Sequence, residues 1–68
     1  MRQVVIYPDE TGMWVAECPS LPGCISQGET FETAVENIRD AIHEYIESLR
    51  DEGRDIPADT YSTHLVIV

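Results

Sequence analysis

The chain has 68 residues and a mass of 7.7 kDa, which is enough for one small domain over residues 1–68. Its 43% hydrophobic and 25% charged residues are ordinary for a folded globular protein and argue against intrinsic disorder. Thirteen acidic residues against four arginines give a net charge of −9, which argues against direct binding to nucleic acid and favours a basic protein partner. No apolar run approaches the ~20 residues of a membrane span, and no secretory signal is recognisable, so we expect a cytoplasmic protein without a membrane segment.

The first half of the chain predicts three short β-strands. Apolar, β-branched and aromatic residues dominate 4–7 and 13–18, and a weaker run follows over 24–28. A polar turn at 9–12 joins the first two runs, and a loop with two prolines and a glycine at 19–23 joins the second pair. Because both connections are short, we expect the strands to be antiparallel neighbours.

The second half predicts one long helix and then a last strand. Thr30 is the expected N-cap and Gly53 the expected residue after the helix end. Residues 64–68 predict a final strand, which gives the order β-β-β-α-β: an α+β fold with one helix covering one face of an antiparallel sheet. Helical spacing is kept by Phe31, Ala34, Val35, Ile38, Ala41, Ile42, Tyr45, Ile46 and Leu49.

The predicted helix is longer than the predicted sheet. About 22 helical residues span ~33 Å, whereas strands of five or six residues span only ~17–20 Å. The last turns of the helix therefore need cover from elsewhere. The candidates are a second subunit or the loop that carries Ile56, Pro57 and Tyr61.

The outer strands are apolar on both faces, although one helix can cover only one face. In the first strand Val4 and Ile6 alternate with Val5 and Tyr7, and residues 65–68 are all apolar. We therefore expect the uncovered face or an edge to be buried against a second copy, in a homodimer or higher homo-oligomer.

The helix also carries a row of carboxylates, which we call the acidic row: Glu32, Glu36, Asp40 and Glu44. One interpretation is a surface for a basic partner, with Glu36, Asp40 and Glu44 as contacts. The other is an ordinary solvated helix face in an acidic protein. A metal-dependent nuclease site is less favoured, because such sites gather acids from several elements in a cleft.

The remaining reactive side chains suggest no catalytic, metal or cofactor site. Cys18 and Cys24 flank the proline loop, and we interpret them as small buried thiols rather than a disulfide or redox pair. The spacing of His43 and His64 fits no zinc pattern, and neither has an evident catalytic partner. Trp14 is predicted to anchor the core beneath the helix.

The sequence resembles the HicB-like family over nearly its whole length. The likeness is carried by the pattern Gly12-Met13-Trp14-Val15-Ala16-Glu17, by Leu21-Pro22-Gly23-Cys24, by Gly28-Glu29-Thr30, and by Ala34, Asn37-Ile38, Gly53 and Ile56-Pro57. The combination is fairly specific, although no single piece of it would be. Where many relatives have an acid before Leu-Pro-Gly, this chain has Ser20.

This resemblance implies a partial ribonuclease-H-like fold and a non-enzymatic antitoxin of a type II toxin–antitoxin system. HicB-like proteins bind and block HicA, a small basic ribonuclease that cleaves mRNA. Many full-length relatives add a C-terminal DNA-binding module, but this sequence has no basic segment or second helical pattern after the long helix, so we do not expect it to bind operator DNA. Two alternatives stay open: a stand-alone homo-oligomeric HicB-like domain without a toxin, and a degenerate ribonuclease-H-like nuclease.

Overall fold

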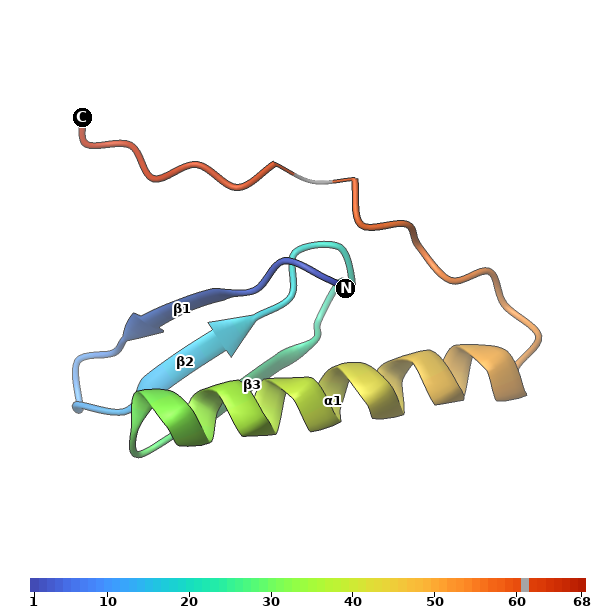
Figure 1. Cartoon of the computed structure of the whole chain (residues 1–68), viewed down its shortest axis with the longest axis horizontal. Helices are drawn as coiled ribbons and strands as arrows, with labels where there is room; N and C mark the ends of the chain where they lie inside the picture. The colour runs from blue at the N-terminus through green and yellow to red at the C-terminus, as the bar shows by residue number, and fades with distance from the viewer. Residues whose placement is uncertain (61) are drawn as a thin grey trace.

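A computed structural model describes residues 1–60 and 62–68. It contains β1 (Val5–Pro8), β2 (Trp14–Glu17), β3 (Ile25–Gly28) and α1 (Phe31–Asp51). The strands form one antiparallel sheet in the order β1-β2-β3, and α1 lies across one side of it (Figure 1). The α+β class, the three antiparallel neighbours and the long helix are thereby confirmed.

The turn between β1 and β2 is organised by one carboxylate. Asp9 Oδ1 accepts hydrogen bonds from Thr11 N at 2.8 Å, Thr11 Oγ1 at 2.7 Å and Met13 N at 3.0 Å. Gly12 completes the turn with a φ of +88°, a region that L side chains rarely adopt. The hydrogen bond from Thr11 is the main cause that lowers the pKa of Asp9, with smaller backbone contributions, while burial acts in the opposite direction.

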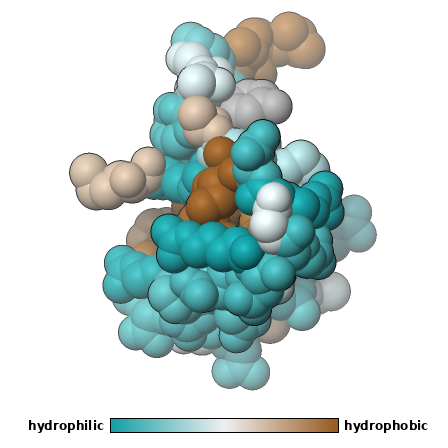
Figure 2. Space-filling view, turned by 90° about the vertical axis from the view of Figure 1, so that its right-hand side faces the viewer, coloured by the Kyte–Doolittle hydropathy of each residue, from teal (hydrophilic) through white to brown (hydrophobic). Residues whose placement is uncertain are grey.

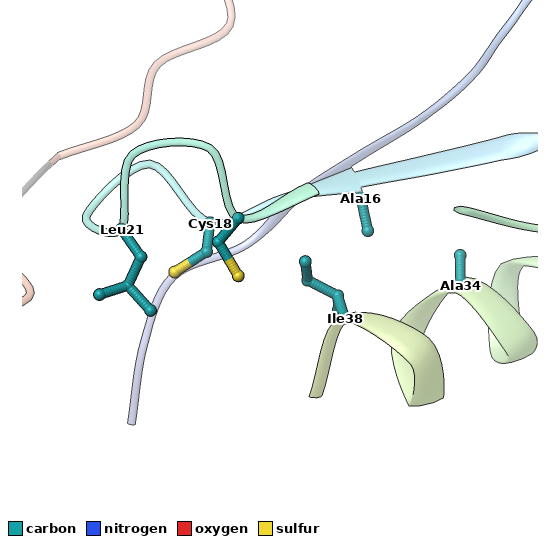
Figure 3. Packing of buried hydrophobic residues seen from close by; sticks show 6 residues of the cluster. Ala16, Cys18, Leu21, Ala34 and Ile38 are labelled. Carbon is teal, nitrogen blue, oxygen red and sulfur yellow. The ribbon is translucent and has the colours of Figure 1, made fainter. Parts of the chain in front are cut away.

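The loop between β2 and β3 closes on itself and contributes to the core. Cys18 N donates to Cys24 O at 3.0 Å, and Leu21 is fully buried. Figure 3 shows Leu21 and Cys18 reaching toward the same interior as Ala16 of β2 and the helix residues. The buried core consists of Ala16, Cys18, Leu21, Cys24, Ala34 and Ile38.

Both ends of α1 are capped as the sequence predicts. Thr30 Oγ1 accepts from Thr33 N at 3.1 Å, which satisfies one of the free amides of the first turn. At the other end, Gly53 adopts a φ of +68°, and its amide donates to Arg50 O at 3.0 Å.

The start of α1 approaches β3 closely, and Gly28 makes this approach feasible. A Cβ on Gly28 would lie 2.6 Å from Ala34 N and 2.8 Å from the carbonyl carbon of Thr33, closer than such atoms approach in folded proteins. Asn37 Nδ2 fixes the contact by donating to Gln27 O at 2.8 Å. The close packing of α1 on β3 therefore requires a residue without a side chain at position 28.

The C-terminal turns of α1 extend past the sheet, as the lengths predict (Figure 1). Tyr45 Oη donates to Pro22 O at 2.8 Å, so the proline loop supports this part of the helix. Ile56 lines the same groove as Ile46 and supplies part of the expected cover. The predicted contribution of Tyr61 falls outside the described residues.

The final strand predicted over 64–68 does not form. Residues 62–68 are extended but have no strand assignment, and Leu65 and Ile67 are 97% and 94% exposed. Figure 1 shows this segment running apart from the sheet. A strand needs a neighbouring edge as well as β-branched residues, and the single chain does not bring these residues to an edge. The order in the described chain is therefore β-β-β-α.

Candidate functional site

The acidic row lies on the outer face of α1. Glu36 and Asp40 are each two residues from Ile38, and two residues correspond to about 200° around an α-helix. Because Ile38 is 98% buried against the sheet, the row points away from it. All four carboxylates are exposed, and Glu36 to Glu44 covers about 12 Å at 1.5 Å per residue. The helix therefore presents these charges to solvent as one surface.

No basic side chain neutralises the row within the described part of the chain. The two ion pairs found there are Arg50–Glu47 at 3.0 Å and Arg54–Glu52 at 3.3 Å, both at the C-terminal end of the helix region. Like charges four residues apart repel each other mildly, so the row does not stabilise the helix. Its charges are free to attract a basic surface.

The two cysteines that flank the proline loop form no disulfide. Cys18 and Cys24 are both buried and both free, in agreement with their interpretation as core residues. Burial is the main cause that raises the pKa of the Cys24 thiol, and the neighbouring Cys18 raises it further, while Arg2 acts in the opposite direction. A raised pKa keeps the thiol protonated and unreactive.

The other singled-out side chains have structural or exposed positions. Trp14 is partly buried against the core and meets Phe31 edge to face, with ring centroids 5.6 Å apart. His43 and His64 are exposed. Among residues 1–60 and 62–68, no three His, Cys, Asp or Glu side chains are gathered closely enough to hold a metal ion, and no helix has the length and apolarity needed to cross a bilayer.

Ser20 forms a contact that the sequence analysis did not anticipate. Its side chain is 99% buried, and its hydroxyl accepts a hydrogen bond from Arg2 Nη1 at 2.9 Å. The N-terminal segment is thereby tied to the proline loop. The two residues are 18 positions apart, and no local pattern links them.

The structure also reveals a groove of about 680 Å³ between the β1 side of the sheet and α1. Arg2, Arg39 and Arg50, three of the four arginines of this acidic chain, line it together with mostly apolar side chains. We call it the arginine-rimmed groove. On the face seen from the C-terminal end of α1, Figure 2 shows apolar surface enclosed by hydrophilic side chains. The spacing of Arg39 and Arg50 in the sequence indicates that both lie on the same side of the helix, because eleven residues are close to three helical turns.

Comparison with known protein families gives a match over nearly the whole chain. The family described as HicB_like antitoxin of bacterial toxin-antitoxin system matches residues 3–66. The chain belongs to this family. The HicB-like family assignment rests on nearly the whole sheet-and-helix unit, and so confirms the resemblance seen in the motifs around the proline loop and the helix start.

Individual relatives support the same assignment. The UPF0150 protein Ta0767 of Thermoplasma acidophilum is 48% identical over 56 residues, which cover 82% of this chain and 81% of that protein. The UPF0150 protein ssr1765 of Synechocystis sp. is 46% identical over 56 residues, covering 82% and 71% of the two chains. The crystal structure of the N-terminal domain of Burkholderia pseudomallei antitoxin HicB superposes with a TM-score of 0.75 at 33% identity, covering 88% of this HicB-like chain and 69% of that one.

Proposed function

We propose that this HicB-like protein is the antitoxin of a type II toxin–antitoxin pair and acts without catalysis. In this proposal it binds a small basic HicA-like ribonuclease in the cytoplasm and covers the surface that would otherwise hold mRNA. Family membership supports an antitoxin role, and the net charge of −9 supports a basic partner. An acidic surface can occupy a phosphate-binding surface because it presents the same sign of charge.

The observation that carries the choice of surface is the exposed, unneutralised acidic row. Glu36, Asp40 and Glu44 protrude from a helix that is capped at both ends and packed on the sheet. The charges are thus held on a rigid element, and binding does not require the backbone to become ordered. We assign the toxin contact to these three carboxylates.

The test is reversal of this charge in the full chain. We expect Glu36→Lys/Asp40→Lys/Glu44→Lys to weaken binding to the HicA-like partner toxin by well over tenfold, a loss of more than about 1.4 kcal/mol. Isothermal titration calorimetry at low salt measures it. The control Glu10→Lys/Asp51→Lys/Asp55→Lys makes the same change in net charge at exposed sites outside the row.

The control separates a local contact from overall charge. If both triple variants weaken binding equally, the toxin senses net charge and the row is not the contact. Unchanged affinity in the first variant at low salt removes the row from the interface. If the native host encodes no small basic toxin next to this gene, the stand-alone homo-oligomeric alternative is favoured instead.

A further inference from the structure

The arginine-rimmed groove exists because α1 does not cover the whole sheet. The helix packs mainly over β3 and β2, and only its margin meets β1. The space left between the helix and β1 has a volume of about 680 Å³, which is in the size range of pockets that hold small molecules. Its floor is aliphatic and therefore costly to leave in water. The β1 side supplies Val4 and Ile6, and the helix supplies Val35, Ile38, Ile42 and Ile46.

The segment after the helix adds a third wall to the groove through Ile56 and Asp59. This wall is tied to the start of the chain, because Gln3 N donates to Asp59 Oδ2 at 3.0 Å and Thr63 N donates to Gln3 Oε1 at 3.4 Å. The sheet, the helix and this segment thus enclose an apolar floor, and the arginines lie along its rim. A charged group at the rim stays in contact with water, so it does not incur the cost of burying a charge.

The groove is locally positive in a chain that is otherwise strongly negative. Arg2, Arg39 and Arg50 line it against a single carboxylate, that of Asp59. Arg39 forms no ion pair in the described part of the chain, whereas Arg2 and Arg50 each already use one guanidinium nitrogen, in bonds to Ser20 and to a helix glutamate. A free guanidinium is well suited to a carboxylate, because its planar N–H groups can form two parallel hydrogen bonds.

The length of the floor also indicates the kind of ligand. From Arg39 to Arg50 the helix rises about 16 Å at 1.5 Å per residue, and an extended dodecanoate chain has a similar length. Starting from Arg39, such a chain would pass Ile42, Ile46 and Ile56, which all line the groove. The charge at the rim and the aliphatic floor therefore match the two parts of one amphipathic anion.

A dissolved carboxylate fits these features better than a membrane surface. An anionic bilayer repels a chain with a net charge of −9 as a whole, whereas a single dissolved anion meets mainly the local field of the arginines. The groove also lies beside the acidic row and not on it, because Arg39 and Asp40 are consecutive and so about 100° apart around the helix. The inference is therefore independent of the proposed toxin contact.

We propose that the arginine-rimmed groove binds a free long-chain carboxylate, with the carboxylate on the guanidinium group of Arg39 and the alkyl chain on the aliphatic floor between β1 and α1.

The test uses dodecanoate, below its micelle concentration, as the probe. In the full chain with ¹³C-labelled methyl groups, we expect the resonances of Ile42, Ile46 and Ile56 to shift with one common dissociation constant. Octanoate has a shorter chain and should bind at least about tenfold more weakly, because it buries less apolar surface. Equal affinity for the two carboxylates would overturn the proposal, because the floor would then contribute nothing.

The charge of the head group provides a second arm with the natural chain. Dodecyltrimethylammonium has the same alkyl chain and the opposite charge, and the net charge of −9 alone would favour it. The arginine rim favours the carboxylate instead, so we expect dodecanoate to shift the groove methyl resonances at concentrations at which the cation does not. An equal or stronger response of these methyl groups to the cation would overturn the proposal.

The third arm locates the carboxylate. We expect Arg39→Gln to weaken dodecanoate binding at least about fivefold, because it removes a charge-assisted hydrogen bond. Arg54→Gln is the matched control, since it makes the same change in net charge at the arginine that does not line the groove, and it should alter the affinity by less than about twofold. Equal losses in the two variants would show that only net charge is sensed and would overturn the proposal.

Other occupants and other sources have their own outcomes. If dodecanoate shifts only the methyl resonances of residues 65–68, the exposed segment after the helix holds it and the proposal is overturned. Binding to vesicles of anionic lipid without any response to dissolved dodecanoate would assign the groove to a membrane surface and would overturn it as well. None of these measurements involves the toxin, so their outcome and that of the charge-reversal test are independent.

Discussion

Two stretches that carry apolar side chains differ sharply in burial in this molecule. In the proline loop Leu21 is completely buried, and the flanking Cys18 and Cys24 are almost completely buried, whereas residues 65–68 are all exposed. The loop differs in that its backbone is closed by its own hydrogen bonds and braced by Tyr45. Apolar character supplies the driving force for burial, but satisfied backbone groups decide whether burial takes place within one chain.

Substituting one leucine in each stretch by alanine tests whether the two stretches contribute differently to stability. We expect Leu21→Ala to lower the free energy of unfolding by about 2–5 kcal/mol, because it leaves a cavity in a closed core. Leu65→Ala, measured at a dilution at which the chain is a single copy, should change it by no more than about 0.5 kcal/mol. Urea unfolding followed by circular dichroism measures both, and equal losses would contradict the contrast between the two stretches.

The approach of α1 to β3 provides a second, smaller test of the buried region. Gly28→Ala should cost about 1–3 kcal/mol, because the new methyl group meets rigid backbone at the helix start and not a flexible side chain. Ser26→Ala on the same strand is the matched control and should cost clearly less. A neutral Gly28→Ala would mean that the helix can move away from the sheet at no cost.

The turn at Asp9 is the third test, and its effect depends on pH. The folded pKa of Asp9 lies below its ordinary value of 3.8, so the carboxylate stabilises the fold above that value. This stabilisation is lost as the pH falls through the folded pKa. We expect Asp9→Asn to be less stable than the natural chain at pH 7, with a difference that shrinks below about pH 4.

The control for that experiment is Glu10→Gln, which removes a neighbouring exposed charge that takes no part in the hydrogen bonds of the turn. Its stability should follow that of the natural chain across the same pH range. If Asp9→Asn keeps a constant difference down to pH 3, ionisation of this carboxylate does not support the turn.

Local signals in the sequence were sufficient for most of the fold. The helix follows from its apolar period, and Thr30 and Gly53 mark its ends because capping depends on residues within one turn. The three strands follow from short apolar runs separated by turn residues. The class and family could therefore be predicted without coordinates.

Features that depend on distant residues could not be predicted in the same way. The hydrogen bond of Arg2 to Ser20 and the support of Tyr45 by Pro22 join positions 18 and 23 residues apart. The prediction of a final strand was wrong for a related reason. The pattern of 65–68 favours a strand but does not say which edge of a sheet that strand would join. The exposed acidic row was foreseeable from its spacing, and its role as the toxin contact stays a prediction.

The hydrogen bonds that hold Thr63 and Asp59 beside Gln3 have a consequence for how the two ends of the chain respond to substitution. They join positions 56 and 60 residues apart, so the segment that follows the helix is tied to the residues that precede β1. A substitution of Gln3 that removed its side-chain amide would therefore act on both ends of the chain at once.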